Sequence, residues 1–227
     1  MTKVKSGVLL VGLTGGIASG KTEVAKVLRR KGAKIISGDL IGRQVVEQNP
    51  MVLKKLVQAF GDEILTKKGK LNRNKLGSLA FSSRAGQKKL NRIVHPRLLR
   101  KLHAEINDAR SQFSRVKKSA SPKRKLVIID AALITEWGLH DKLDMTVMVA
   151  SPARDRIKRL LRQGLTRKEA LKRIARQHTD SQRRRFCDFV IENDGSLSKL
   201  RQKAENLYHR LMVRLILKGL DELSLPV

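Results

Sequence analysis

The chain has 227 residues, of which 41% are hydrophobic, and it contains a single cysteine, Cys187. These values exclude an intrinsically disordered chain and a disulfide framework within the chain. With 50 Lys and Arg against 20 Asp and Glu, the formal net charge is +30, so the protein attracts anions of many kinds.

The first elements in chain order form a strand–helix–strand unit. Val8–Leu13 is a short apolar run of the kind that forms a buried parallel strand, and Thr22–Lys31 has the spacing of a helix that ends at Gly32. Ala33–Ile36 is a second short strand. Such units form parallel sheets, because the helix carries the chain back to the starting edge.

The middle of the chain is poor in strand signals. Helical patterns occupy Leu40–Phe60, with a break at Asn49-Pro50, and three further helices are predicted over Lys75–Phe81, Arg84–Val94 and Pro96–Ser114. We interpret this stretch as a helical insertion, which ends in a basic loop over Lys117–Lys125.

The alternation of strands and helices then resumes. The predicted strands are Leu126–Asp130, Met145–Ala150 and Phe189–Ile191, and the predicted helices are Arg154–Arg162, Arg167–Gln177 and Leu197–Leu217, the last capped by Ser196 or Ser198. Five short apolar strands that alternate with helices predict an α/β fold of three layers around a parallel sheet. Ligands of such sheets bind where the strands end.

A phosphate-binding loop follows the first strand and opens the first helix. Its sequence matches G-x-x-x-x-G-K-[ST] at every position, with Gly15, Gly16, Ile17, Ala18, Ser19, Gly20, Lys21 and Thr22. Glycines allow the backbone N–H groups to point into one cavity, and the positive end of the helix adds to their attraction for phosphate. Lys21 is positioned for the β- and γ-phosphates of ATP, and the Thr22 hydroxyl for Mg²⁺.

Six segments in order along the chain resemble the dephospho-CoA kinase family. They are LTGGIASGKT at 13–22, GAKIISGDLIGRQVV at 32–46, LNRIVHP at 90–96, LITEWGL at 133–139, RIARQ at 173–177 and VIENDGS at 190–196. The resemblance implies transfer of the ATP γ-phosphoryl group to the ribose 3′-hydroxyl of dephospho-CoA. It also implies a P-loop kinase core with a five-stranded parallel sheet (about 8–48, 125–162 and 187–217), a helical CoA-binding subdomain (about 49–116) and a lid (about 163–186), all in one domain.

Site residues follow from the matching positions. The resemblance implies that Asp39 is the catalytic base or holds Mg²⁺ through water, although a helix N-cap is an alternative for this residue. It implies that Arg43, His95 and Glu136 contact the acceptor, with solvent exposure or a structural role as the alternatives. Asn193 and Gly195, within the family's N-x-G, are expected near the adenine.

The lid is strongly basic. Residues 151–186 contain 13 Lys and Arg against 3 Asp and Glu. Arg159 and Arg162 lie three residues apart on one helix face, where they would neutralise charge on the transferred phosphoryl group. Arg173 and Gln177 match the family's R-I-x-x-Q. A solvated basic face is the alternative for any single arginine.

Three departures from the family pattern bear on activity. The first Asp of the family's I-D-A-D segment is Ser37, the usual P-L-L is Ala131-Ala132-Leu133, and a loop glycine is Ala18. The alternatives to the predicted reaction are a related nucleoside or nucleotide kinase, a catalytically inactive homologue, and a basic P-loop NTPase that binds nucleic acid.

Partners and location follow from composition. We expect ATP and dephospho-CoA as substrates and no obligatory nucleic acid, although non-specific binding of polyanions fits the charge. No run of about 18 apolar residues is present, so no membrane partner is expected. A single cysteine favours a reducing compartment, and hence the cytoplasm.

Overall fold

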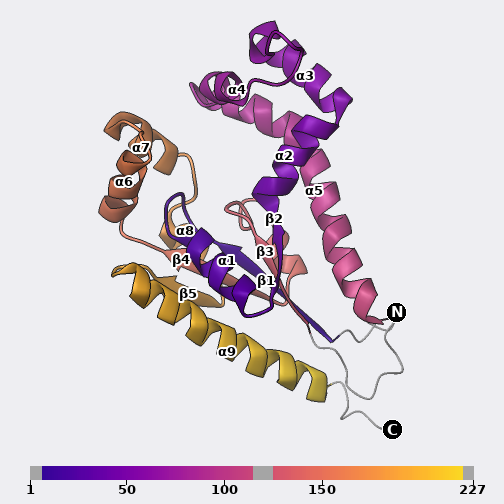
Figure 1. Ribbon diagram of the computed structural model, residues 1–227, viewed down its shortest axis with the longest axis vertical. Coiled ribbons are helices and arrows are strands. Elements are labelled where there is room, and N and C mark those ends of the chain that lie inside the picture. The colour runs from indigo at the N-terminus through magenta and orange to yellow at the C-terminus, as the bar shows by residue number, and fades with distance from the viewer. Residues whose placement is uncertain (1–6, 115–124, 222–227) are drawn as a thin grey trace. The chain divides into compact units, whose positions relative to one another are not determined.

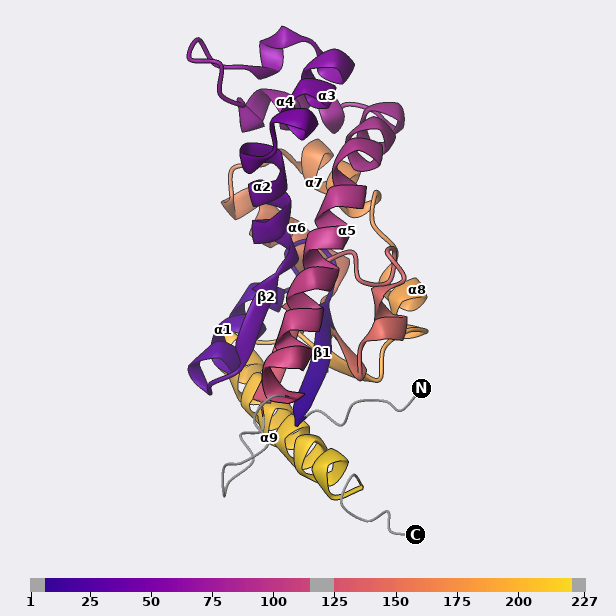
Figure 2. The same ribbon diagram turned by 90° about the vertical axis from the view of Figure 1, so that its right-hand side faces the viewer.

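The computed structural model describes residues 7–114 and 125–221. They form two compact units (Figures 1 and 2). The nucleotide-loop unit holds the chain up to Ser37 and from Ile106 onward, and the helical unit is Gly38–Glu105. The subdivision predicted from the sequence, with a helical subdomain over about 49–116, has different bounds and stays a prediction. The basic loop predicted over Lys117–Lys125 lies outside the described residues, except that Lys125 begins a strand.

The sheet of the nucleotide-loop unit has five strands, and every strand pair is parallel. Their order is β2-β3-β1-β4-β5, and their bounds are β1 Val8–Thr14, β2 Lys34–Ser37, β3 Lys125–Asp130, β4 Met145–Ala150 and β5 Phe189–Glu192 (Figure 1). Leu13 and Ser37 both pair with Asp130 in the register, so β1, β2 and β3 end at one edge of the sheet. The predicted α/β fold with a five-stranded parallel sheet is confirmed.

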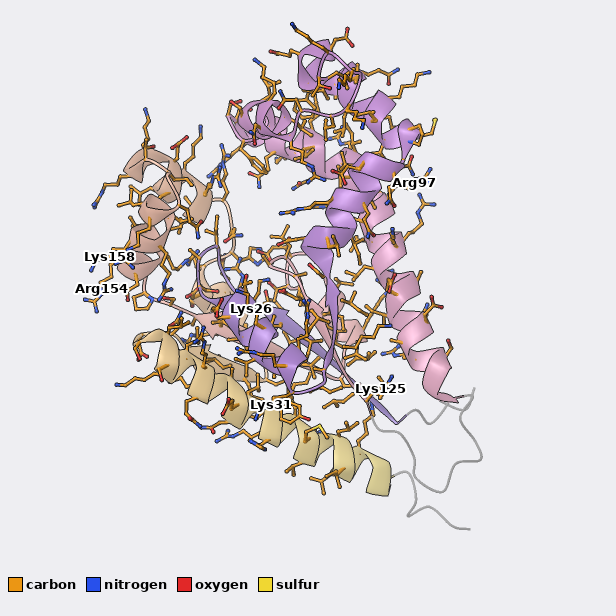
Figure 3. The ribbon with its side chains drawn as sticks, viewed as in Figure 1. Lys26, Lys31, Arg97, Lys125, Arg154 and Lys158 are labelled. Atoms are coloured by element: carbon orange, nitrogen blue, oxygen red, sulfur yellow. The ribbon has the colours of Figure 1, made fainter. Side chains whose placement is uncertain are left out.

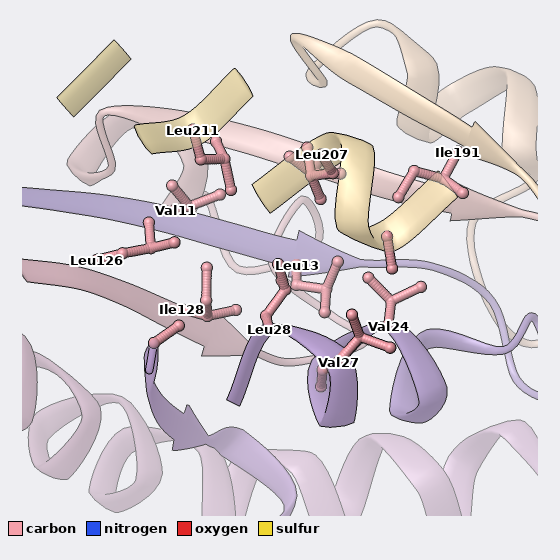
Figure 4. Packing of buried hydrophobic residues seen from close by; sticks show 14 of the residues in the cluster. Val11, Leu13, Val24, Val27, Leu28, Leu126, Ile128, Ile191, Leu207 and Leu211 are labelled. Carbon is pink, nitrogen blue, oxygen red and sulfur yellow. The ribbon is translucent and has the colours of Figure 1, made fainter. Parts of the chain in front are cut away.

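Helices α1 (Lys21–Arg30) and α9 (Leu197–Asp221) pack together and bury the main core against the sheet (Figure 4). The apolar residues of α9 recur every three or four positions, which gives the helix one buried face. Each of these side chains, when fully buried, contributes about 1.5–3 kcal/mol to stability. The core includes Val11, Leu13, Val24, Leu28, Ile128, Val149, Leu207 and Leu211. Ser196 caps α9, because its hydroxyl accepts a hydrogen bond from the Lys199 N–H at 3.3 Å.

Three shorter helices follow β4. They are α6 (Ala153–Arg162), α7 (Arg167–Ile174) and α8 (Asp180–Arg184). Helix α7 ends three residues before the sequence prediction, and α8 was not predicted because five residues are too few for a periodic signal. A capping box of Thr179 and Gln182 fixes the start of α8.

The helical unit contains α2 (Gly38–Gln48), α3 (Pro50–Phe60), α4 (Arg73–Ala80) and most of α5 (Arg84–Ser114). The break predicted at Asn49-Pro50 is present: the Asn49 side chain accepts a hydrogen bond from the Val52 N–H at 3.2 Å, and Pro50 takes the first helical position. Asp39 lies in the first turn of α2 and not at its N-cap, since the helix already begins at Gly38.

The prediction of two helices that meet at Pro96 was wrong. Residues Arg84–Ser114 form one helix, with Pro96 inside it. Proline removes one backbone hydrogen bond and disfavours helix at the preceding residue. The buried residues Val94, Leu98, Leu102 and Ile106 recur every four positions across the proline, so one continuous apolar face outweighs that local cost.

In the described part of the chain, no helix is both long enough and apolar enough to cross a membrane.

Candidate active site

The phosphate-binding loop connects β1 to α1 and has a backbone shape that requires glycine at two positions. Gly15 has a φ of 151° and Gly20 a φ of 100°. A Cβ on Gly15 would lie 2.5 Å from the Val149 carbonyl oxygen, and one on Gly20 would lie 2.5 Å from Asn193 Nδ2. Ala18 also has a positive φ, 58°, which costs a residue with a Cβ about 1–2 kcal/mol.

Lys21, the loop lysine, forms an ion pair with Asp130. Asp130 is the last residue of β3 and lies opposite Leu13 in the sheet register, so its carboxylate is at the strand ends beside the loop. Both side chains are largely buried, with exposed fractions of 11% for Lys21 and 14% for Asp130. An aspartate at this position relative to the loop holds Mg²⁺ in many P-loop NTPases.

The residues near the loop fit a magnesium ion. Mg²⁺ in kinases binds through one or two protein oxygens and completes its octahedron with phosphate oxygens and waters. The exposed Thr22, in the first turn of α1, and Asp130 offer one hydroxyl and one carboxylate. Across residues 7–114 and 125–221, no group of three or more His, Cys, Asp and Glu side chains is arranged to hold a metal, which such a phosphate-dependent site does not need.

Three consecutive carbonyl groups of the loop each accept a hydrogen bond from a side chain. Arg156 Nε donates to the Ile17 oxygen at 2.9 Å, Arg159 Nη1 to the Ala18 oxygen at 2.9 Å, and Asn193 Nδ2 to the Ser19 oxygen at 2.7 Å. These side-chain contacts to the carbonyls stabilise the shape of the loop. N–H groups that are already partly ordered bind phosphate at a lower cost of reordering.

Arg156 was missed by sequence reasoning, although it lies three residues before Arg159 on α6. The predicted Gln177 also contacts the loop, since its Oε1 accepts a hydrogen bond from the Ile17 N–H at 2.7 Å. The signal that could have identified Arg156 is its spacing from Arg159, which places both on one helix face. Arg154, on the same helix, extends away from the loop (Figure 3).

A cavity of about 460 Å³ adjoins the loop. Its size is in the range of small-molecule sites. It brings together five of the predicted residues: Gly20, Arg159, Arg162, Asn193 and Gly195. The other lining residues are Glu23, Asp155, Lys158, Asp194, Leu197 and Leu200. Leu197 and Leu200 provide an apolar wall on which a flat base can pack.

Glu136 has partners within the nucleotide-loop unit. Its Oε1 accepts from Arg183 Nη2 at 2.9 Å and from the His178 N–H at 3.3 Å, and its Oε2 accepts from the Thr135 hydroxyl at 2.8 Å. The side chain of Arg183 is fully buried. The Glu136 carboxylate is therefore the counter-ion of a buried guanidinium. The acceptor contact predicted for Glu136 stays a prediction.

The other predicted acceptor residues belong to the helical unit. Asp39 and Arg43 are exposed on α2, four residues apart and so on one face of that helix. His95 is half-buried in α5, and this burial lowers its pKa below the usual value, so the imidazole is neutral near pH 7. Their predicted roles stay predictions.

Comparison with known proteins gives consistent matches over most of the chain. The family model described as dephospho-CoA kinase matches residues 9–199. The dephospho-CoA kinase of Corynebacterium diphtheriae is 37% identical over 202 residues, which are 88% of this chain and 96% of that protein. The dephospho-CoA kinase of Listeria monocytogenes serotype 4b is 34% identical, over 89% of this chain and 96% of that protein.

Solved structures share the fold. A crystal structure of a protein from Thermus thermophilus has a TM-score of 0.67 at 31% identity and covers 89% of this chain and 97% of its own. Two more distant structures support the fold alone. A dephospho-CoA kinase from Campylobacter jejuni has a TM-score of 0.61 at 22% sequence identity, and the match covers 90% of this chain and 98% of that one. A shikimate kinase from Acinetobacter baumannii has a TM-score of 0.51 at 13% sequence identity, and the match covers 91% of this chain and 94% of that one.

Proposed function

Because this chain belongs to the dephospho-CoA kinase family, we propose that it transfers the γ-phosphoryl group of ATP to the ribose 3′-hydroxyl of dephospho-CoA, forming coenzyme A. The observation that carries the proposal is the complete phosphate-binding loop, with Lys21 at the strand ends, in a chain whose residues 9–199 match the family. It is therefore a phosphotransferase that acts on an alcohol group.

The loop and the adjoining cavity would hold ATP. The phosphates are bound by the start of α1 and by the loop N–H groups other than those of Ile17 and Ser19, which donate to Gln177 and to the Gly16 carbonyl. Lys21 moves from Asp130 to the β- and γ-phosphates. The base occupies the cavity lined by Asn193, Gly195 and Leu197. The support for this placement is the continuity of the cavity with Gly20, the last glycine of the loop.

Thr22 and Asp130 would hold Mg²⁺. The ion supplies positive charge that neutralises the phosphate oxygens during transfer. The departure at Ser37 removes one carboxylate expected in the family, and Asp130 offers a carboxylate at the paired position of β3.

Asp39 would act on the acceptor. Its carboxylate takes the proton from the attacking 3′-hydroxyl, and Arg43, His95 and Glu136 contact dephospho-CoA. The charge of the moving phosphoryl group is met by Arg159 and Arg162. The support for the two arginines is their place on α6 beside the loop, where Arg159 Nη1 donates to the Ala18 carbonyl at 2.9 Å. The lid excludes water, which prevents hydrolysis of ATP.

The same proposal covers partners and location. ATP and dephospho-CoA are the substrates, nucleic acid is not required for activity, and the charge allows non-specific binding of polyanions. The reaction takes place in the cytoplasm, where the single Cys187 stays reduced.

The direct test is release of ADP from ATP and Mg²⁺ by the purified protein, with dephospho-CoA, AMP or CMP as the acceptor. We expect release to depend on dephospho-CoA, with coenzyme A detected by mass spectrometry. Release that depends on AMP or CMP would instead identify a nucleotide kinase. ATP binding without acceptor-dependent release would identify an inactive homologue.

A further inference from the structure

Residues 175–186, which lie between α7 and β5, contact the phosphate-binding loop directly and through Arg156. We name this stretch the latch segment. Its Gln177 accepts a hydrogen bond from the Ile17 N–H at 2.7 Å, while Arg156 donates to the Ile17 carbonyl at 2.9 Å. Arg156 in turn lies 3.5 Å from Asp180 Oδ1 of the latch segment. The N–H group of Ile17 is therefore bonded to the latch segment itself, and its carbonyl group to an arginine that contacts the latch segment.

Arg156 is tightly enclosed against the loop. It is 5% exposed, and its Nη2 is buried and has no hydrogen-bond partner among the described residues. A Cβ on Gly16 would lie 2.3 Å from that Nη2, so the guanidinium lies directly against the Gly16 backbone. Burial lowers the pKa of Arg156 and the Asp180 carboxylate opposes this effect, as expected for a buried cation that depends on one counter-ion.

A second buried arginine continues the chain of contacts. Arg183 Nη1 lies 3.9 Å from the same Asp180 oxygen, and Arg183 Nη2 donates to Glu136 at 2.9 Å. Arg183 Nη1 also donates to the His178 carbonyl at 2.5 Å. Two arginines and two carboxylates thus form an alternating series from Ile17 to the segment after β3. Because the charges balance and both guanidinium groups are buried, removal of one carboxylate leaves a buried arginine without that partner.

The remaining contacts of the latch segment include an ion pair between Arg184 and Glu192 and a ring contact between Phe186 and His140, with centroids 4.6 Å apart. Helix α8 has five residues, and its one buried residue is Arg183, a charged side chain rather than an apolar one. Segments with few buried apolar contacts open at low free energy. The docked position of this segment therefore depends on its polar contacts, of which those through Arg156 and Gln177 lead to the phosphate-binding loop.

We propose that Arg156 is a positioning residue that couples nucleotide binding in the loop to docking of the latch segment. A nucleotide that holds the loop in its bound shape keeps the Ile17 carbonyl in place for Arg156, and Arg156 keeps Asp180 docked. By linkage, the docked latch raises nucleotide affinity by the same factor. The inference rests on the proposed nucleotide site but not on the identity of the acceptor.

Hydrogen exchange by mass spectrometry tests the coupling in the full chain, with ADP and Mg²⁺ as the probe. In the natural protein, ADP should slow exchange in peptides that cover residues 175–186. Arg156→Gln should abolish this slowing and raise the Kd for ADP about tenfold, a usual size for coupling between sites. The KM for ATP should rise by a similar factor, with little change in the KM for dephospho-CoA.

Arg154→Gln is the matched control. Arg154 is on the same helix, its side chain is 81% exposed, and its nearest acidic partner is Asp155 at 3.8 Å. This variant should keep both the ADP affinity and the slowing of exchange. If Arg156→Gln is unfolded, Asp180→Asn interrupts the same series with a side chain of equal shape, and it should also abolish the ADP-dependent slowing while ADP still binds.

The coupling is wrong if Arg156→Gln and Asp180→Asn both fold, bind ADP within twofold of the natural protein and retain the slowing of exchange. Failure of the proposed reaction would look different, because ADP binding and exchange are measured without dephospho-CoA. A natural protein that does not bind ADP would overturn both proposals at once.

Discussion

The two units of the molecule use positive charge in opposite ways. In the nucleotide-loop unit, Arg156 and Arg183 are buried and Lys21 is largely buried, and each contacts a named carboxylate. In the helical unit, Gly38–Glu105, 15 Lys and Arg accompany 5 Asp and Glu, and every one of these cations is exposed except the half-buried Lys101. A buried charge requires a partner at a fixed position, whereas exposed charges act together through an electrostatic potential that salt screens.

Replacement of Lys21 should have the largest effect of the changes considered. Lys21→Ala removes the cation that reaches the β- and γ-phosphates, and we expect kcat/KM to fall by about 10³-fold, the lower end for loss of a cation that stabilises a transferred phosphoryl group. Acceptor-dependent ADP release measures this. Lys31→Ala, at an exposed position just after α1, is the control and should leave kcat/KM unchanged. Equal losses in both variants would contradict the special role of Lys21.

Arg183→Met should cost the most stability. It leaves Glu136 in a partly buried site without its guanidinium partner, and breaking such a pair costs about 3–5 kcal/mol. Urea unfolding followed by circular dichroism measures the change. Arg92→Gln, on the exposed surface of the helical unit, should change stability by less than about 0.5 kcal/mol. A cost for Arg92→Gln as large as that for Arg183→Met would remove the contrast between the two units.

Asp39 tests whether the helical unit takes part in the chemistry. Asp39→Asn keeps the shape of the side chain but removes the base, so we expect kcat to fall about 10²-fold with ATP affinity retained. Asp62→Asn, at another exposed position of the helical unit, is the control. Near-normal turnover of Asp39→Asn would show that another group takes the proton.

Several parts of this architecture could be predicted from the sequence because their signals are local. Each strand is a short apolar run, and the phosphate-binding loop is a contiguous motif between a strand and a helix. The joining of two predicted helices through Pro96 could not be predicted by local rules. There, the packing of Val94, Leu98 and Leu102 along one face overrides the preference of proline for a helix start.

The series of charges formed by Arg156, Asp180, Arg183 and Glu136 could not be predicted from the sequence, for a different reason. Ile17 and Arg156 are 139 residues apart, and Arg183 occurs in a run of three arginines that resembles a solvated basic face. Burial, which distinguishes Arg183 from Arg184 and Arg185, depends on tertiary contacts alone. Charge composition predicts an anion-binding region but could not identify which arginines hold the loop.

Exposed cations of the helical unit should account for part of any polyanion binding. Arg84, Lys88 and Arg92 are exposed and recur every four residues along α5, so they share one face. Neutralising all three to Gln should reduce the slope of log K against log salt for duplex DNA by up to about 2.7, with kcat/KM for dephospho-CoA unchanged. Fluorescence anisotropy at several salt concentrations measures this slope. An unchanged slope would place the polyanion contacts elsewhere.

The smallest expected effect concerns His95, whose pKa is shifted by burial. Burial lowers the pKa of His95 in the folded state below its value of 6.5, so the unfolded chain binds more protons at pH values below 6.5. The stability from this residue is therefore complete above pH 6.5 and declines as the pH falls toward the folded pKa, with a slope of at most about 1.4 kcal/mol per pH unit. Unfolding at pH 7.5 and 5.5 should show a smaller difference for His95→Gln than for the natural protein. His209→Gln, on the last helix, serves as the control. If His95→Gln retains the full pH dependence, carboxylates rather than His95 are responsible for it. The stability of the helical unit would then not depend on the protonation of this half-buried histidine.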